Sequence, residues 1–443
     1  MKPNVLILVV DSLRADRVLD GPRSCRTPNL DAFRASGTTF TQAYSVASMT
    51  NVCVASMLTG TYPFVHGVHS LAGTRLRADL PTLAELFKAN GYRTWAEMTG
   101  PLEAFTGLDR GFDEYRYRGY TEWLDTRFGA ELAARLERGP RPWLGYVHLW
   151  EVHYPRRITR PYNRSRHGEL LYDRAVSSLD NQLGRLLGSV PDDTLVVLTS
   201  DHGEYLPQSR RDELVTRLKG PAAWLKRNVP GAKRLRRRLL PLLVGETRTG
   251  AAAGAERYRA WLGHGFHVFE PLVHVPLLMR GPGLPAGGTS ISTLVSHVDL
   301  FLTLASVVEL DGGGSSYLSG LDLTSLLRDG SAPPRDGVYL QASGARKMSR
   351  PDQWLAGLRT DRYKYARGMH NDGLPEELYD LEHDPDEREN LAAARPDVAA
   401  ELRTRLSGLM QTDAPEASAV ETAYTPEEEE LLEARLRELG YLD

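Results

Sequence analysis

Three residues that can act as nucleophiles lie close together in the stretch VASMTNVCVASMLTGTYPFVHGV, residues 46–68. Thr50 and Ser56 offer hydroxyl groups, and Cys53 offers a thiol. Each becomes a strong nucleophile only when a base, a nearby cation or a metal ion helps to remove its proton. The choice among the three decides the chemistry, because a thiol and a hydroxyl form different covalent intermediates.

Carboxylates and imidazoles stand directly behind three short apolar runs. These residues are Asp11 after the run 4–10, Glu151 and His153 after the run 143–150, and Asp201 and His202 after the run 194–200. Parallel strands end at a common edge, where ligands bind, so we expect these side chains to converge. Oxygen and imidazole ligands beside a hydroxyl make a site for one divalent cation, which lowers the pKa of the hydroxyl and withdraws charge from a phosphoryl or sulfuryl oxygen.

The elements that must position these residues follow an alternating pattern. Apolar runs alternate with helical segments through the first three-quarters of the chain, which predicts a mostly parallel sheet flanked by helices. After about residue 340 the pattern changes to short strands and turns, followed by helices. We therefore predict an α/β catalytic domain over residues 1–340 and a small α+β domain with antiparallel strands and terminal helices over residues 341–443.

Composition limits the class of protein. The 443 residues suit two or three domains at roughly 150 residues each, and we take two as the working number. A content of 41% apolar and 25% charged residues is typical of a globular chain rather than a disordered one. The apolar run 5–10 is too short for a signal peptide and lacks a cleavage site. With no long apolar run and only two cysteines, we expect a cytoplasmic protein.

A basic segment over residues 206–248 interrupts the α/β pattern. It holds twelve lysines and arginines against three acidic residues, a balance of +9, which leaves −12 for the rest of a chain with net charge −3. The segment is either a solvated surface insertion or a lid, with Lys219 among its cations, that grips an anionic or lipid-phosphate substrate. Peripheral membrane contact stays open, and we do not expect nucleic acid as a partner.

Several blocks, in this order, resemble the sulfatase-like members of the alkaline phosphatase superfamily. The blocks are NVLILVVDSLRADRV, TPNLDAFRASGTTFTQAYS, LTGTYPFVHGV, VHLWEVHYPR, LTSDHGEYL, GHGFHVFEPLVHVPLLMRGPG, SHVDLFLTLASVV and LYDLEHDPDERENL. The resemblance implies an alkaline phosphatase-like fold: a large, mostly parallel sheet flanked by helices, with a smaller C-terminal domain. It also implies a metal-binding first strand and an Asp-His metal motif.

The same resemblance distinguishes between the candidate nucleophiles. Sulfatases carry a cysteine, converted to formylglycine, ten residues before the glycine of the Leu-Thr-Gly block, and counting back from Gly60 gives Thr50. Cys53 is only seven residues before Gly60, and Met57 stands where the modification motif has arginine. We therefore expect Cys53 to be an ordinary buried residue. Thr50 resembles the threonine nucleophile of nucleotide pyrophosphatase/phosphodiesterases and phosphoglycerol-type transferases.

Other positions depart from the sulfatase pattern or match it only in part. Ser12 replaces a second aspartate, and the Lys-x-His that sulfatases carry after the strand resembled by YRTWAEMTGPL is missing. The residues carried over are Asp11, Thr50, Asp201 and His202 for one metal, His153 and His264 for the substrate, leaving group or a second metal, and Arg14, Asn51 and Lys219 for substrate binding. We expect His66, His148, His267 and His297 to pack or hydrogen-bond. Zn or Mn fits best, with Mg or Ca possible.

These residues predict a metal-dependent hydrolase of phosphoric or phosphonic esters that forms a covalent phospho-threonine on Thr50. Three alternatives stay open. A sulfatase with an unconventional nucleophile would use the same pocket, a phosphotransferase would pass the group to an alcohol, and a binding protein would have no turnover. The natural substrate and the oligomeric state are not predicted.

Overall fold

The structure is a computed structural model of the chain. It describes residues 2–438 apart from residues 22, 72–74, 120, 207–263, 286, 313–316, 345–350 and 413–423. None of the helices in these ranges has both the length and the apolar character that crossing a bilayer requires. Lys219 and all of the basic segment beyond Leu206 lie outside the described residues.

The largest sheet of the described chain has the strand order β5-β4-β6-β1-β7-β8-β2-β9. Its strands are β1 (Asn4–Val10), β2 (Thr38–Phe40), β4 (Arg93–Met98), β5 (Glu114–Tyr117), β6 (Trp143–Leu149), β7 (Thr194–Ser200), β8 (Leu277–Arg280) and β9 (Thr289–Ile291). All neighbours pair parallel except β8, which runs antiparallel to β7 and β2. The mostly parallel sheet predicted from the sequence is confirmed.

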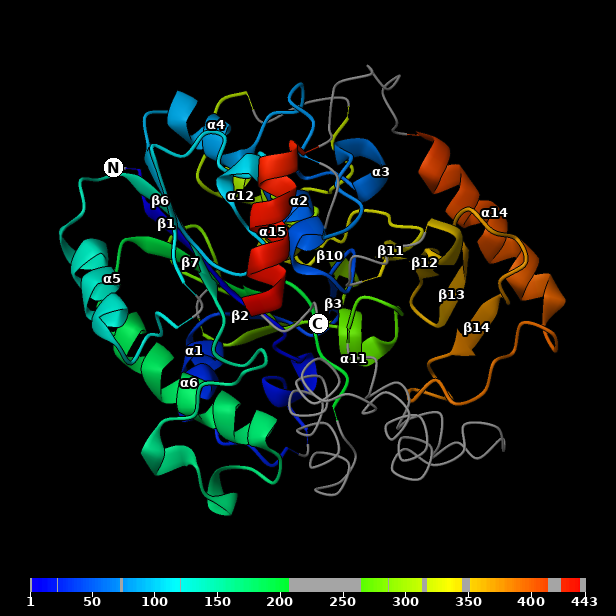
Figure 1. Cartoon of the computed structure of the whole chain (residues 1–443), viewed down its shortest axis with the longest axis horizontal. Coiled ribbons are helices and arrows are strands. Elements are labelled where there is room, and N and C mark those ends of the chain that lie inside the picture. The colour runs from blue at the N-terminus through cyan, green and yellow to red at the C-terminus, as the bar shows by residue number, and fades with distance from the viewer. Residues whose placement is uncertain are drawn as a thin grey trace, which may run out of the picture.

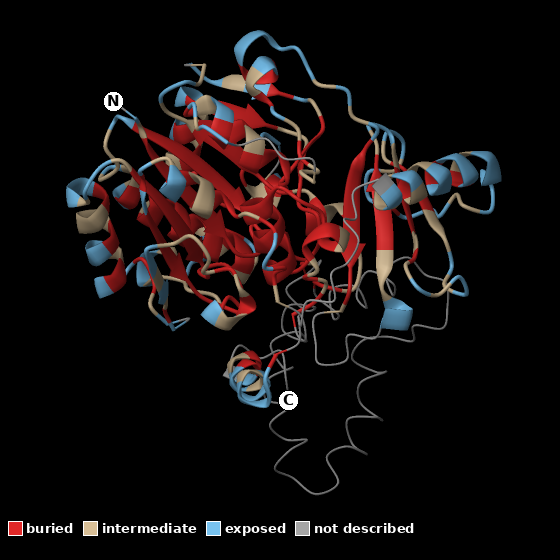
Figure 2. Ribbon diagram, turned by 90° about the horizontal axis from the view of Figure 1, so that it is seen from above, coloured by how far each residue is buried: buried red, intermediate tan, exposed pale blue. Residues whose placement is uncertain are grey.

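The central strand β1 is buried over its whole length and feeds two separate cores. Val5, Ile7 and Val9 face one core, and Leu6 and Leu8 face the other, because successive side chains of a strand point to opposite faces. Helices cover both faces of the sheet. The sequence of β1 is therefore continuously apolar and does not alternate between apolar and polar residues. Figure 1 shows the two helical layers around the strands, and Figure 2 shows the buried strands between them.

The helices divide between these two cores. α2 (Thr50–Thr59), α4 (Leu83–Ala89) and α12 (Asp299–Val307) pack in the first core. α1 (Pro28–Ser36), α5 (Arg127–Arg138) and α6 (Leu171–Leu187) pack in the second. Shorter elements are α3 (Pro63–His66), α11 (Glu270–Val273), α13 (Thr324–Asp329), β3 (Ala43–Tyr44) and β10 (Val295–Ser296), with 3₁₀ turns at Ala15–Arg17, Ala104–Thr106, Arg160–Tyr162, Ser165–His167 and Pro351–Gln353.

A second, antiparallel sheet lies near the C-terminus. Its strands are β11 (Val338–Ala342), β12 (Leu355–Arg359), β13 (Tyr363–Gly368) and β14 (Glu377–Asp380), with the helices α14 (Pro396–Thr412) and α15 (Pro426–Glu438) after them. This agrees with the small α+β unit expected at the C-terminus, while the domain boundary at residue 340 stays a prediction. α15 returns to the large sheet, where Arg435 Nε lies 2.9 Å from Glu103 Oε1.

The small sheet also supports the segment that leads to Thr50. The backbone N–H of Gln341, on β11, donates to the carbonyl of Val46 at 2.8 Å. Ser48 Oγ donates to the carbonyl of His267 at 2.9 Å and accepts from the N–H of Gly265 at 3.2 Å. The extended residues before α2 are therefore fixed from two sides, which fixes where the helix begins.

His297 is buried beneath the end of β7, with Nε2 3.2 Å from Thr199 Oγ1. Burial lowers its pKa to about 4, against an opposing influence from the charge of Asp201. In an unfolded chain the pKa of histidine is about 6.5. As the pH falls below 6.5 the unfolded state therefore takes up a proton first, and the stability of the folded state decreases.

We predict that this effect costs about 2 kcal/mol between pH 7 and pH 5, because 1.5 pH units below the unfolded pKa correspond to that amount. Urea unfolding in the presence of EDTA should show wild type losing about 2 kcal/mol more than His297→Gln over this interval. The chelator keeps metal binding out of the comparison. An equal loss in both proteins would contradict the assignment.

Candidate active site

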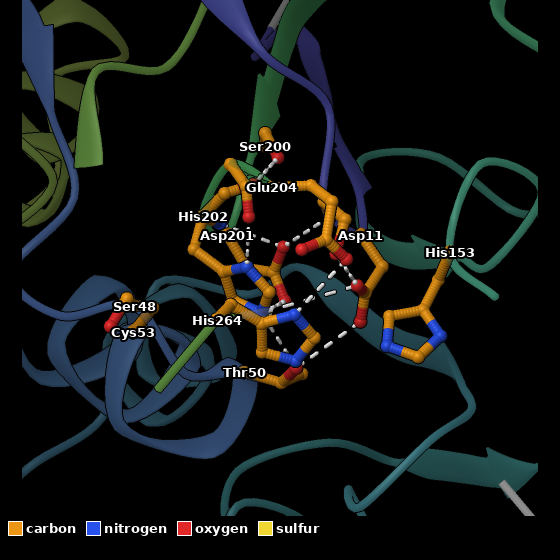
Figure 3. A network of polar contacts seen from close by, with 12 residues as sticks. Asp11, Ser48, Thr50, Cys53, His153, Ser200, Asp201, His202, Glu204 and His264 are labelled. Carbon is orange, nitrogen blue, oxygen red and sulfur yellow. Dashed lines mark hydrogen bonds and ion pairs between the residues drawn. The ribbon is translucent and has the colours of Figure 1, made fainter. Parts of the chain in front are cut away.

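Residues from two strand ends, one strand interior and one helix start meet at the carboxyl ends of the central strands of the large sheet (Figure 3). Asp11 follows β1, and Asp201 and His202 follow β7. Because β1 and β7 pair with Val10 opposite Ser200, the two aspartates come next to each other. Thr50 approaches them as the first residue of α2. The structure thus brings together the four residues that the sequence analysis assigned to one metal.

The hydroxyl of Thr50 points at this cluster. Thr50 Oγ1 donates to Asp11 Oδ2 at 3.1 Å and lies 3.3 Å from His202 Nε2. Thr50 is buried at the amino end of a ten-residue helix, where the partial positive charge favours an anion. The same helix ends at Gly60, whose φ of +65° and contact with Phe301 exclude a side chain. The Leu-Thr-Gly block therefore fixes the length of α2.

Two imidazoles face the two carboxylates. His148 Nε2 lies 3.4 Å from Asp201 Oδ2 and 3.7 Å from Asp11 Oδ2. His202 Nε2 lies 3.7 Å from Asp201 Oδ2 and 4.0 Å from Asp11 Oδ1. Ligands bound about 2.0–2.1 Å from one tetrahedral ion stand roughly 3.3 Å apart, so these spacings need little change to hold an ion.

The charges of this cluster also fit a cation. All four side chains are fully buried, and within the described chain neither aspartate forms an ion pair with lysine or arginine. Burial, and then the charge of Asp201, raise the pKa of Asp11 well above its ordinary value. Burial would also raise the pKa of Asp201, but His202 and His148 outweigh it and lower that pKa. Buried carboxylates are costly unless a cation compensates them, so a divalent ion fits this site.

His148 hydrogen-bonds to Asp201, in line with the expectation that it packs or hydrogen-bonds, but the sequence analysis did not place it among the metal candidates. It belongs with Asp11 and Asp201 to a buried group able to hold a metal ion. His148 lies inside β6, and the pairing of β6 with β1 places it beside Asp11. The sequence held a signal for this position. Side chains of a strand alternate between its two faces, so His148 lies on the same face of β6 as Leu144 and Tyr146, which pack in the core that contains α2.

Glu151 does not join the cluster, although it follows the same strand. Its Oε1 accepts a hydrogen bond from the backbone N–H of Leu124 at 2.8 Å. The side chain is buried and holds a loop, so it is structural. The order of residues at the end of β6 did not reveal this difference from His148.

A second group of side chains borders the first. His264 Nδ1 lies 3.3 Å from Glu204 Oε2, and the His264 ring is 4.5 Å from the ring of His202 and 5.3 Å from that of His153. His153 packs on the Trp150 ring at 3.9 Å, with Nδ1 2.6 Å from the carbonyl of Tyr154. Both histidines predicted to meet the substrate thus lie beside the metal candidates (Figure 3).

The protonation of these groups differs. Burial, and then the charge of His264, lower the pKa of His153 well below its ordinary value, so its ring is neutral at pH 7. Burial would raise the pKa of Glu204, but the charge and hydrogen bond of His264 outweigh it and lower that pKa. Glu204 was missed by the sequence analysis, although it stands two residues after His202 in LTSDHGEYL.

Two predicted substrate-binding residues are engaged elsewhere. Arg14 pairs with Asp16 at 2.7 Å and donates from Nη1 to the carbonyl of Glu204 at 3.1 Å, so it supports the site from outside the cluster. Asn51 is buried, and its Nδ2 donates to the carbonyl of Ser70. Asn51 therefore holds the loop after α3 in this structure.

The other two candidate nucleophiles have structural partners. Cys53 is fully buried, as expected, its Sγ donates to the carbonyl of Ala47 at 3.0 Å, and burial raises its pKa. Figure 3 shows it turned away from the cluster. Ser56 Oγ lies 2.9 Å from His66 Nε2. Because His66 Nδ1 accepts from the N–H of Val68, Nε2 carries the proton and cannot act as a base toward Ser56.

Metal removal is predicted to destabilise the protein and abolish its activity. Dialysis against EDTA should lower the melting temperature, and Mn²⁺ or Zn²⁺ at about 100 times its dissociation constant should restore about 2.7 kcal/mol. Metal analysis should give one ion per chain in wild type and none in Asp201→Asn. Full metal content in Asp201→Asn would contradict the assignment.

Cys53 is predicted to be unreactive while the chain is folded. A buried thiol with a raised pKa forms little thiolate, so iodoacetamide at pH 8 should leave Cys53 unmodified, as measured by mass spectrometry of peptides. Labelling in 6 M guanidinium provides the positive control. Rapid labelling of the folded protein would return Cys53 to the list of nucleophiles.

Comparison with known proteins identifies the family of this chain. The family model "Sulfatase" matches residues 3–310, and "N-sulphoglucosamine sulphohydrolase, C-terminal" matches residues 260–412. Arylsulfatase A of Homo sapiens is 25% identical over 90% of this chain and 86% of its own length. N-acetylgalactosamine-6-sulfatase of Canis lupus familiaris is 25% identical over 76% of this chain and 68% of its own.

Solved structures show the same fold. A phosphonate monoester hydrolase of Agrobacterium radiobacter superposes with a TM-score of 0.69 at 21% identity, over 92% of this chain and 95% of that one. A putative sulfatase from Bacteroides thetaiotaomicron gives 0.67 at 19% identity, over 96% and 99%. With the family model spanning most of the chain and the site built on the strand ends that it covers, this protein belongs to the sulfatase family of the alkaline phosphatase superfamily, a family of ester hydrolases that use a divalent metal ion.

Proposed function

We propose that this protein hydrolyses phosphoric or phosphonic esters with Thr50 Oγ1 as the nucleophile. The observation that carries the proposal is the position of this hydroxyl, within hydrogen-bonding distance of both Asp11 and His202 at the start of α2. Sulfatases use a formylglycine made from cysteine, and threonine cannot supply that aldehyde. A phospho-threonine, by contrast, can be cleaved by a second attack at phosphorus.

The residues around Thr50 can take its proton. His202 Nδ1 lies 2.8 Å from the carbonyl of Gly203, so Nδ1 carries the ring proton and Nε2 presents a lone pair toward Thr50. The carboxylate of Asp11 already accepts from the hydroxyl. A divalent ion held by Asp11, His148 and Asp201 would lower the pKa of the Thr50 hydroxyl and neutralise charge on the ester oxygens, and it would leave His202 Nε2 to take the proton. We assign Zn or Mn to this position on the basis of its donor set.

His264 suits the role of general acid better than His153 does. The carboxylate of Glu204 lies 3.3 Å from His264 Nδ1 and stabilises a protonated ring, which can give a proton to the leaving oxygen. His153 is held neutral, and its Nδ1 is occupied by the carbonyl of Tyr154. His153 therefore orients the substrate in this proposal. Water then attacks phosphorus and releases Thr50.

Sulfate esters are the second candidate substrate class. The specific observation in their favour is that the curated relatives are named as sulfatases, including arylsulfatase A and N-acetylgalactosamine-6-sulfatase. Sulfate and phosphate esters present similar tetrahedral oxygens, so the same residues could bind either anion. The identity of residue 50 is the reason for ranking phosphorus esters first.

A panel of four aryl esters tests both classes on metal-loaded protein. The substrates are p-nitrophenyl phosphate, bis-p-nitrophenyl phosphate, p-nitrophenyl phenylphosphonate and p-nitrophenyl sulfate. We expect turnover of a phosphorus ester that falls at least about a thousandfold in Thr50→Ala, because removal of a nucleophile eliminates the covalent path. Cys53→Ala is the matched control and should keep its activity. Mass spectrometry of acid-quenched protein should find the phosphoryl group on Thr50.

Each of the other possible results would support a different conclusion. Sulfate turnover that is lost in Thr50→Ala would favour the second candidate, and turnover that survives this substitution would refute Thr50 as nucleophile. Release of p-nitrophenol that rises with added glycerol, with the group recovered on glycerol, would identify a transferase.

A further inference from the structure

The loop between β6 and α6 carries a charge that the proposed mechanism does not use. The chain enters this loop directly after His153, and residues 154–170 contain five arginines against one acidic residue, Glu169. The loop lies in the described part of the chain and is distinct from the basic segment 206–248. A strongly charged surface beside an active site attracts ligands of the opposite charge.

Arg156 is the member nearest the catalytic residues. Its guanidinium lies 5.5 Å from the centre of the Tyr172 ring. Tyr172 Oη donates to the carbonyl of Ser12 at 2.6 Å and accepts from the N–H of Arg14 at 2.9 Å. Arg156 therefore lies beside the segment that leaves β1 at Asp11, and its charge acts on Glu204 at the second group of site residues.

The outer part of the loop is held against the start of the chain. Ser177 Oγ donates to the carbonyl of His167 at 2.7 Å and accepts from the N–H of Arg26 at 2.8 Å. Arg166 Nε donates to His167 Nε2 at 3.1 Å. Burial, and then the charges of Arg166, Arg26 and Arg164, lower the pKa of His167, which shows that these like charges gather around one ring.

In the described part of the chain, most of these arginines form no ion pair with a carboxylate, although the charge of Arg156 acts on Glu204. Among the ion pairs of the described chain, Arg157 binds Asp125 and Arg23 binds Asp31. No such pair with a carboxylate is formed by Arg26, Arg156, Arg160, Arg164 or Arg166. Four of these five are exposed, and Arg156 is half-buried. Guanidinium groups bind sulfate and phosphate through paired hydrogen bonds, so the cluster is available for such anions.

The surface favours a soluble ligand over a membrane. On this loop, Tyr154 is the large hydrophobic side chain that is exposed, at 47%. Stable binding to a bilayer needs more buried apolar area than one tyrosine provides, in addition to charge. A ligand with several charged groups and little apolar surface matches the arginines better.

We propose that Arg26, Arg156, Arg160, Arg164 and Arg166, here named the arginine surface, bind additional anionic groups of the substrate, so that the substrate is a soluble oligoanion bearing several sulfate or phosphate groups. The inference rests on the proposed function for the ester that is cleaved. The arginine surface adds recognition of groups that do not react, and it makes a single isolated ester a poor mimic of the full substrate.

Two triple variants of the full-length protein test this proposal. One removes Arg160, Arg164 and Arg166 by substitution with Gln. The matched control substitutes Arg93, Arg138 and Arg185 with Gln, which are exposed and lie near the strand starts of β4 and β6 or the end of α6, away from the site. Both variants lose three positive charges, so a difference between them reports position and not net charge.

Fluorescence anisotropy with labelled dextran sulfate and with labelled linear polyphosphate measures affinity at fixed ionic strength. We expect the loop variant to bind about tenfold more weakly or worse and to show a shallower salt dependence, with the control close to wild type. Turnover of a small aryl ester should stay within about twofold of wild type in both variants. Tighter binding of one polyanion over the other identifies sulfate or phosphate as the preferred group.

Equal affinity of the loop and control variants for both polyanions would overturn the proposal. So would binding to phosphatidylserine vesicles that depends on the loop arginines while polyanion binding does not, which would identify a membrane surface. The binding assay is repeated in Thr50→Ala protein. Failure of Thr50 as nucleophile would then leave the binding result unchanged, so the two proposals fail separately.

Discussion

Two buried carboxylates held side by side are the constraint on which the rest of this structure depends. β1 and β7 pair in parallel with Val10 opposite Ser200, so the next residues, Asp11 and Asp201, must share one space. The N–H of Ser12 donates to Asp201 Oδ1 at 3.1 Å and keeps them together. Their mutual repulsion in a dry interior demands compensation, which the imidazoles of His148 and His202 supply in part and which a divalent cation would complete. The site is therefore a direct consequence of strand register.

Much of the remaining fold keeps this register and brings Thr50 to it. The two cores on either face of β1 prevent the strand from slipping, because a shift by one residue would exchange every side chain between the cores. The antiparallel sheet near the C-terminus holds the segment before α2 through Gln341 and Val46. A small sheet distant in sequence thus helps to set the position of the Thr50 hydroxyl.

Membership of the sulfatase family and the identity of residue 50 favour different substrates. The family brings the sheet, the use of a divalent metal ion and an ester-hydrolase chemistry. In the proposed function, Thr50 takes the place of the one group that gives sulfatases their particular intermediate, and Asp11 and His202 are the acceptors within reach of its hydroxyl. A site of this kind can exchange one covalent path for another without altering the strands beneath it, because the change is confined to a single side chain at a helix start.

The sequence by itself determined the strands, the mostly parallel large sheet, the antiparallel strands near the C-terminus and the residues at strand ends. Apolar runs and the polar residues that follow them are local features of the chain. Asp11, Asp201 and His202 were accessible in this way, and the spacing to Gly60 singled out Thr50. Only the tertiary structure decided that His148 faces the aspartates and that Glu151 turns away to Leu124. Which side chains of neighbouring strands meet depends on strand order and on the face that each residue occupies, and neither is fixed by the residues next to it in the chain.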